Sequence, residues 1–271
     1  CVFTLFSPYT FLSWTKFLES MSYESGVVQG SLPVPYTLQF VGTAPYFFQI
    51  KNFFWQMGLV TVPALIGFTL FIVFAIKKKK KTFILFLSFP ILYILYVGAW
   101  HTKFVRFMLP FLPFLILSAS WFLFKIKGRS QTLGRFLISF FCIATFLWAL
   151  SFFSIYTKEQ TRITASLWIY QHIPVESKLL GEHWDDGLPV SLNSLSPGLY
   201  DIDQLTIYES DNNEKIKYYA EKLSEAEYII INSRRLYGTL MYLPAKYPIT
   251  SRYYELLFAG SLGYEKVAEF T

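Results

Sequence analysis

The first half of the chain contains four long apolar runs separated by short charged breaks. The runs cover residues 57–76, 82–100, 104–124 and 136–156. Each is close to the ~20 residues that a helix needs to cross the hydrocarbon core of a bilayer, and a spanning segment must be helical to satisfy its own backbone hydrogen bonds. The pattern therefore predicts an α-helical membrane region of about four transmembrane helices over residues 56–156.

The segments on either side of this region have different patterns. Residues 1–55 are rich in turns and aromatic side chains, and we expect an extracytoplasmic loop with interfacial helices, one of them over residues 11–21. Beyond residue 156, helix and strand patterns alternate, which predicts a small extracytoplasmic α/β domain with a partly parallel sheet over residues 157–271. The expected helices there are 157–173, 213–223 and 250–259, and the expected strands are 178–182, 205–208, 227–232 and 263–270.

The charges divide the chain in the same way. Residues 1–156 carry 13 Lys or Arg and 2 acids, whereas residues 157–271 carry 11 Lys or Arg and 16 acids. Because the polar part has no basic excess, a nucleic acid is excluded as the expected partner. Nine cations lie in Lys77–Lys81 and in 125–135, so the positive-inside rule places these two loops in the cytoplasm and the C-terminal domain outside a multi-pass cell-membrane protein.

The break between the second and third runs holds three candidate phosphate-binding residues, His101, Lys103 and Arg106. A cation held near the bilayer centre costs up to roughly 2.5–3.5 kcal/mol, so cations that enter an apolar run are expected to have a functional role. In a helix the i, i+3 spacing places Lys103 and Arg106 on one face, where they can grip a phosphate. The alternative is that they are snorkelling anchors at the membrane interface.

A second candidate cluster follows the expected strand 178–182. Glu182, Asp185 and Asp186 lie where α/β domains place functional loops, and they suit a divalent cation or the hydroxyls of an acceptor sugar. The alternative is a solvated acidic turn. The chain has three histidines and two cysteines, Cys1 and Cys142, which argues against a zinc site and against a disulfide framework.

Four segments, in this order, resemble the membrane glycosyltransferases of the GT-C type, in particular glycosyltransferase family 39, which includes protein O-mannosyltransferases and aminoarabinose transferases. The resemblance extends from about Pro8 to the end of the chain. The segments are Lys103-Phe-Val-Arg106-Phe-Met-Leu-Pro110-Phe-Leu-Pro113, Trp184-Asp-Asp-Gly-Leu-Pro189, Ala226–Gly238 and Tyr247–Gly263.

The resemblance implies an activity and a set of partners. The family transfers a sugar from a polyprenyl-phosphate carrier to a glycan, lipid or protein acceptor on the outer face of the membrane. By position, Lys103 and Arg106, with His101, would hold the donor phosphate. The family's catalytic carboxylate lies in a first outer loop that has no counterpart here, so we expect a C-terminal half that is inactive alone. The alternative is a membrane-anchored extracytoplasmic binding module without catalysis.

Overall fold

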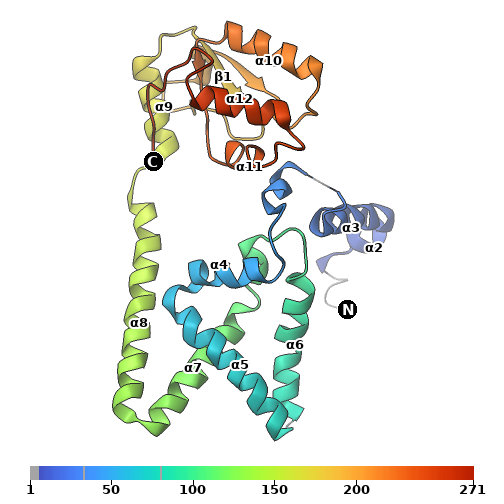
Figure 1. Cartoon of the computed structure of the whole chain (residues 1–271), viewed down its shortest axis with the longest axis vertical. Helices are drawn as coiled ribbons and strands as arrows, with labels where there is room; N and C mark the ends of the chain where they lie inside the picture. Colours follow the sequence, from blue (N-terminus) through green and yellow to red (C-terminus); the bar gives the residue numbers. More distant parts are fainter. Residues whose placement is uncertain (1–5, 33, 80) are drawn as a thin grey trace. The chain divides into compact units, whose positions relative to one another are not determined.

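The chain forms two compact units, Cys1–Ile155 and Tyr156–Thr271, in a computed structural model that describes residues 6–32, 34–79 and 81–271 (Figure 1). The fold is mostly helical with one small parallel sheet. The first unit ends one residue before the domain boundary expected after residue 156. Cys1 and Lys80, which entered the sequence argument, lie outside the described residues.

The first unit begins with short helices. Its opening part contains α2 (Tyr9–Leu12), α3 (Trp14–Gln29), η1 (Pro35–Phe40), α4 (Phe47–Met57) and η2 (Gly58–Val60). Helix α3 covers much of the interfacial helix expected over 11–21 and continues eight residues beyond it. Gly30 ends it in the left-handed conformation, with φ of 81°, which glycine adopts without steric cost.

Four longer helices follow in the same unit, together with one short turn. They are α5 (Thr61–Lys78), α6 (Lys81–Val97), η3 (Val105–Met108), α7 (Leu112–Arg129) and α8 (Gln131–Phe153). In Figure 1 helix α5 crosses α7, and the two are in extensive contact. Gly67 allows this crossing, because a Cβ atom there would lie 2.2 Å from the carbonyl oxygen of Ser118.

Among the described residues, two helical segments, not four, are long and apolar enough to cross a membrane: Phe47–Lys78 and Gln131–His172. Helix α6 is apolar but shorter, with 17 residues. Helix α7 starts only at Leu112, because the 3-10 turn η3 and Pro110 interrupt the run expected from residue 104, and its last turns carry Lys125, Lys127 and Arg129. Of the four transmembrane helices expected from the sequence, two therefore correspond to segments that are long and apolar enough to cross a membrane.

The second unit is an α/β fold. Its elements are α9 (Thr161–His172), β1 (Lys178–Glu182), η5 (Pro197–Leu199), β2 (Asp201–Leu205), α10 (Asn213–Glu225), β3 (Tyr228–Ile229), α11 (Tyr237–Leu240) and α12 (Pro248–Phe258). The 3-10 turn η4 (Ser154–Thr157) spans the boundary between the two units. The strand order is β2-β1-β3, and both pairings are parallel. The sheet is thus wholly parallel, where a partly parallel one was expected.

Three strand expectations differ from the structure. The strand expected over 227–232 is limited to Tyr228–Ile229, the two residues of β3. The strand expected over 205–208 is misplaced, because β2 runs from Asp201 to Leu205. The backbone of β2 pairs with β1, while four of its five side chains face solvent and give no apolar pattern in the sequence. The expected strand 263–270 is not a strand. This segment is held by a side chain instead: the Tyr264 hydroxyl donates to the carbonyl oxygens of Leu223 and Ala226, at 2.7 and 2.8 Å.

Helices cover both faces of the sheet in the second unit. Side chains alternate between the faces of a strand, and Leu179 packs with Ala165 and Ile169 of α9. The Glu182 side chain instead meets Tyr254 of α12. The carboxyl end of β1 therefore lies between its two strand neighbours and beneath α12.

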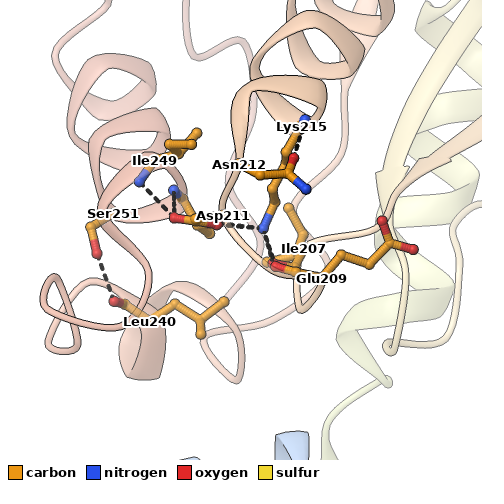
Figure 2. A network of polar contacts seen from close by, with 9 residues as sticks. Ile207, Glu209, Asp211, Asn212, Lys215, Leu240, Ile249 and Ser251 are labelled. Atoms are coloured by element: carbon orange, nitrogen blue, oxygen red, sulfur yellow. Dashed lines mark hydrogen bonds and ion pairs between the residues drawn. The ribbon is translucent and has the colours of Figure 1, made fainter.

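A buried ion pair joins the loop after β2 to α12 (Figure 2). The Lys215 ammonium lies 2.7 Å from Asp211 and also donates to the carbonyl oxygens of Ile207 and Glu209. Asp211 accepts from the backbone amides of Ile249 and Thr250 at the start of α12, at 2.6 and 3.0 Å. The pair thus positions the helix that carries Tyr254.

Candidate functional site

The cationic break of the first unit is held by the end of α3. The Thr102 amide donates to the carbonyl oxygen of Val28 at 3.1 Å, and its hydroxyl donates to that of Val27 at 2.9 Å. Thr102 is 1% exposed, so these bonds are shielded from water. The segment that leads to Lys103 is therefore fixed in place.

Lys103 is a buried cation with few partners. Its residue is 2% exposed, and its ammonium donates to the carbonyl oxygen of His101 at 2.9 Å. Within the described part of the chain, no carboxylate lies within ion-pair distance of it. Burial lowers the pKa of Lys103. An ammonium has three donors, so this group has capacity for a further acceptor.

Arg106 does not share a helical face with Lys103. Lys103 lies outside any helix or strand, and the 3-10 turn η3 begins only at Val105. Arg106 is exposed, and its guanidinium carbon lies 4.1 Å from the centre of the Phe104 ring. The helical premise of the sequence argument is therefore wrong: one cation is buried and the other is stacked on an aromatic ring at the surface.

His101 lies beside Lys103 and against the end of α3. A Cβ atom on Gly30 would approach the His101 ring to 2.7 Å, so the glycine makes room for the imidazole. Burial and then the nearby Lys103 lower the pKa of His101, which favours a neutral ring at pH 7. The structure thus brings His101 and Lys103 together.

Aromatic rings surround Phe104 in this break. Its ring centre lies 5.2 Å from that of Phe40, 5.7 Å from that of Phe107 and 6.3 Å from that of Tyr36. Ring contacts at these separations are stabilising. The cations therefore sit beside an apolar aromatic wall.

In the second unit, Glu182 ends the central strand as a buried carboxyl. Its residue is 1% exposed, and Oε1 accepts a hydrogen bond from the Tyr254 hydroxyl at 2.6 Å. The other oxygen, Oε2, is buried and has no hydrogen-bond partner among the described residues. Burial raises the pKa of Glu182 to about 7, the Tyr254 bond opposes this rise, and the nearby Asp185 adds to it.

Asp185 is bound by the turn that follows β3. Its Oδ2 accepts a short hydrogen bond from the Ser233 hydroxyl, and its Oδ1 lies 3.8 Å from the Arg235 guanidinium. The Arg235 amide donates to the same Ser233 hydroxyl oxygen at 3.1 Å. Parallel strands place their carboxyl ends at one edge of a sheet, and these contacts join the loops after β1 and β3 at that edge.

Asp186 points to a different partner. Its Oδ2 lies 2.7 Å from the guanidinium of Arg162 in α9, which also donates to the carbonyl oxygens of Asp186 and Gly187. The three predicted acids therefore have three separate partners. Across the described ranges, no group of three or more His, Cys, Asp or Glu is arranged to hold a metal ion.

Sequence reasoning missed Tyr254 and Ser233 as partners of the acids. Tyr254 lies 72 residues from Glu182 in the chain, and no local pattern indicates their contact. Both residues lie in segments that carry the family resemblance, Ser233 in Ala226–Gly238 and Tyr254 in Tyr247–Gly263, and this is the signal that could have drawn attention to them.

Comparisons of the chain with protein-family models, with curated proteins and with solved structures each give no match. The two sites therefore rest on their own residues and on the sequence resemblance described above. The first is the cationic loop around Lys103, and the second is the acidic sheet edge around Glu182.

Proposed function

We propose that this chain is the donor-binding part of a membrane glycosyltransferase that uses a polyprenyl-phosphate sugar. The observation that carries the proposal is the buried Lys103 ammonium, which has one hydrogen bond and no ion pair among the described residues. A buried charge without a partner is costly. A phosphate oxygen would supply the missing acceptors and the opposite charge.

The surroundings of Lys103 support a lipid phosphate in particular. The first 156 residues contain two acids, Glu19 and Glu24, and both are exposed on α3. An incoming anion therefore meets little repulsion. The aromatic wall around Phe104 suits the hydrocarbon chain of the carrier, and the exposed Arg106 adds a second positive charge beside it.

The proposed topology follows from the two long apolar segments and the loop charges. We place α5 and α8, the apolar helices within Phe47–Lys78 and Gln131–His172, across the membrane, with α6 and α7 completing a four-helix region. Lys77–Lys81 and residues 125–135 then face the cytoplasm. The Lys103 loop and the second unit face outward, where the sugar acceptor would be a glycan, lipid or protein.

The proposed chemistry is a displacement at the anomeric carbon of the donor sugar. The acceptor oxygen forms a bond to that carbon while the bond from carbon to phosphate oxygen breaks, and the electron pair leaves with the phosphate. Lys103 stabilises the charge that develops on this leaving group. The acceptor proton passes to a carboxylate that lies outside this chain's two sites. Because His101 is neutral, the positive charge beside the phosphate is that of Lys103.

The test is a lipid-binding measurement with the full chain in nanodiscs, using undecaprenyl phosphate and undecaprenol as matched probes. We expect the phosphate to bind at least about tenfold more tightly than the alcohol, and Lys103→Gln to remove that difference. Lys51→Gln, which removes an exposed lysine on α4, is the control and should retain it. Equal affinity for the two lipids, or an unchanged preference in Lys103→Gln, would overturn the proposal.

Sugar transfer is tested separately in isolated cell membranes that contain the native full-length protein. The double variant Lys103→Ala/Arg106→Ala should lose donor affinity and turnover together. Wild-type transfer by this variant would exclude the phosphate grip even if the lipid binds.

One observation favours a second candidate, an outward binding module without catalysis. Glycosyl transfer needs a base, and the two acids of the first 156 residues are exposed on α3 rather than beside Lys103. Retention of phosphate-lipid binding with no transfer to any acceptor would favour this module over the enzyme.

A further inference from the structure

The carboxyl edge of the sheet in the second unit has features of a ligand site that the donor phosphate does not use. Open α/β sheets bind ligands outside the carboxyl ends of their strands. Here that edge carries the loop after β1, which holds Trp184 and Asp185, and the turn after β3, which holds Ser233 and Arg235. These loops are joined to each other by side-chain contacts, so the edge is organised before any ligand arrives.

Trp184 is an exposed aromatic side chain at this edge. It is 51% exposed, and its backbone has φ of 86°, a conformation that bulky residues rarely adopt. Its ring lies edge-to-face against Tyr208, with 6.1 Å between ring centres. Tyr208 therefore holds the indole in place and leaves part of its surface open to solvent.

At the same carboxyl edge, the end of β1 provides a buried hydrogen-bond acceptor without a donor. Glu182 lies two residues before Trp184 and is 1% exposed, and its Oε2 has no partner among the described residues. Asp185 directly follows Trp184 and is close enough to Glu182 to affect its titration. Burial raises the pKa of Tyr208 to about 12, so its hydroxyl remains a donor at pH 7. Acceptors and a donor thus lie around one open aromatic ring.

We propose that this edge of the second unit binds a carbohydrate, with the Trp184 ring stacked on the sugar and with Glu182 and Asp185 accepting hydrogen bonds from its hydroxyls. A sugar ring has an apolar face and several hydroxyl donors, which matches an exposed indole next to carboxylate acceptors. A bound hydroxyl would supply the donor that Glu182 Oε2 lacks. The proposal is independent of the donor phosphate, because no residue of the first unit takes part.

The same residues argue against other ligand classes. Two carboxyls at one edge disfavour an anion. A divalent cation needs several oxygen ligands at once, whereas the Asp185 oxygens already face Ser233 and Arg235 and Asp186 pairs with Arg162. A carboxylate in such contacts can still accept one more hydrogen bond from a hydroxyl. A neutral polyhydroxyl ligand fits the remaining groups best.

The test is saturation-transfer NMR on the detergent-solubilised full chain with a panel of probes. The panel contains the methyl glycosides of glucose, galactose, mannose, arabinose and N-acetylglucosamine. We expect saturable binding of at least one probe at millimolar concentration, with transfer strongest at protons on one face of its ring. Absence of binding by every probe would overturn the proposal.

Trp184→Gly is the decisive variant, because glycine accepts the φ of 86° without strain and the substitution removes only the stacking surface. We expect it to weaken the binding by at least about tenfold, and Glu182→Gln to weaken it by about tenfold. Ile216→Ala and Glu269→Gln remove an exposed apolar side chain and an exposed acid elsewhere in the unit, and both should bind as wild type. Binding by Trp184→Gly equal to that of the wild type would also overturn the proposal. The donor-lipid assay reports on Lys103 alone, so the two proposals fail separately.

Discussion

The Tyr254 hydroxyl donates a 2.6 Å hydrogen bond to Glu182 Oε1 in the core of the second unit. This bond brings the end of the central strand together with helix α12. It satisfies one oxygen of a carboxyl that burial keeps near a pKa of 7. Glu182 therefore exchanges its proton in the range in which most proteins work, and the stability of the unit should depend on pH.

The sign of this dependence follows from the raised pKa. Below about pH 4.5 the carboxyl is protonated in both folded and unfolded chains, and between about 4.5 and 7 only the folded chain retains the proton. The free energy of unfolding should therefore fall as pH rises through this window, by roughly 3 kcal/mol. Hydrogen exchange of the β1 amides, corrected for intrinsic rates, measures this in the second unit alone. Glu182→Gln should flatten the profile, and an equally steep profile in that variant would contradict the assignment.

Removing Lys215 should destabilise the second unit. Lys215→Met leaves Asp211 buried without its ion pair, and a broken buried pair typically costs about 3–5 kcal/mol. The measurement is the same exchange of β1 and α12 amides. Lys222→Met is the matched control, because the partly exposed pair of Lys222 with Asp203 should contribute little to stability. Similar losses in the two variants would argue against the special role of the buried pair.

The crossing of α5 and α7 should not tolerate a side chain at Gly67. A Cβ atom there would lie 2.2 Å from the Ser118 carbonyl oxygen, so Gly67→Ala must push the helices apart. We expect a loss of thermal stability in detergent of at least a few degrees. Gly128→Ala is the control, because it lies in the same pair of helices with nothing within 4 Å, and alanine favours the helix there. A stable Gly67→Ala protein would mean that the helices do not cross as closely as described.

Gly30 and Gly42 form a matched pair for testing the His101 contact. Both have positive φ, 81° and 75°, but a Cβ atom on Gly30 meets the His101 ring at 2.7 Å, whereas one on Gly42 meets nothing within 4 Å. Alanine costs backbone strain at both sites, so the difference between the variants reports the contact. We expect Gly30→Ala, and not Gly42→Ala, to weaken undecaprenyl phosphate binding by displacing the Lys103 loop. Equal affinities in the two variants would separate His101 from the phosphate site.

Periodic and capped elements of the second unit could be predicted from the sequence. Strand 178–182 coincides with β1, and the helix expected from residue 213 is α10, which Asn212 caps by accepting from the Lys215 amide at 2.8 Å. Strand β2 could not be placed, because an edge strand is held by backbone pairing and its exposed side chains carry no apolar pattern. The apolar pattern of the third run likewise extends from residue 104, although the helix starts only at Leu112; Pro110 is the one local sign of this later start.

The sequence indicated which residues belong to the candidate sites, but it did not indicate how their side chains are arranged. The sequence drew attention to Lys103 and Arg106 by their cost in lipid, yet their i, i+3 spacing has meaning only in a helix, and Lys103 precedes the turn. The acids at 182, 185 and 186 are close in sequence, but their partners come from α12, from the turn after β3 and from α9. Such long-range contacts depend on packing that no local pattern encodes.

The two hydrogen bonds from Thr102 to the end of α3 have a mechanical consequence. In the proposed orientation α3 lies at the lipid surface, and these bonds make the helix and the Lys103 loop move together. The depth of α3 in the lipid would then set the height of the ammonium, and a thinner bilayer or looser headgroup packing would change that height without any change in the loop itself. Under the proposed function, the lipid composition would thereby affect how the loop meets a polyprenyl phosphate.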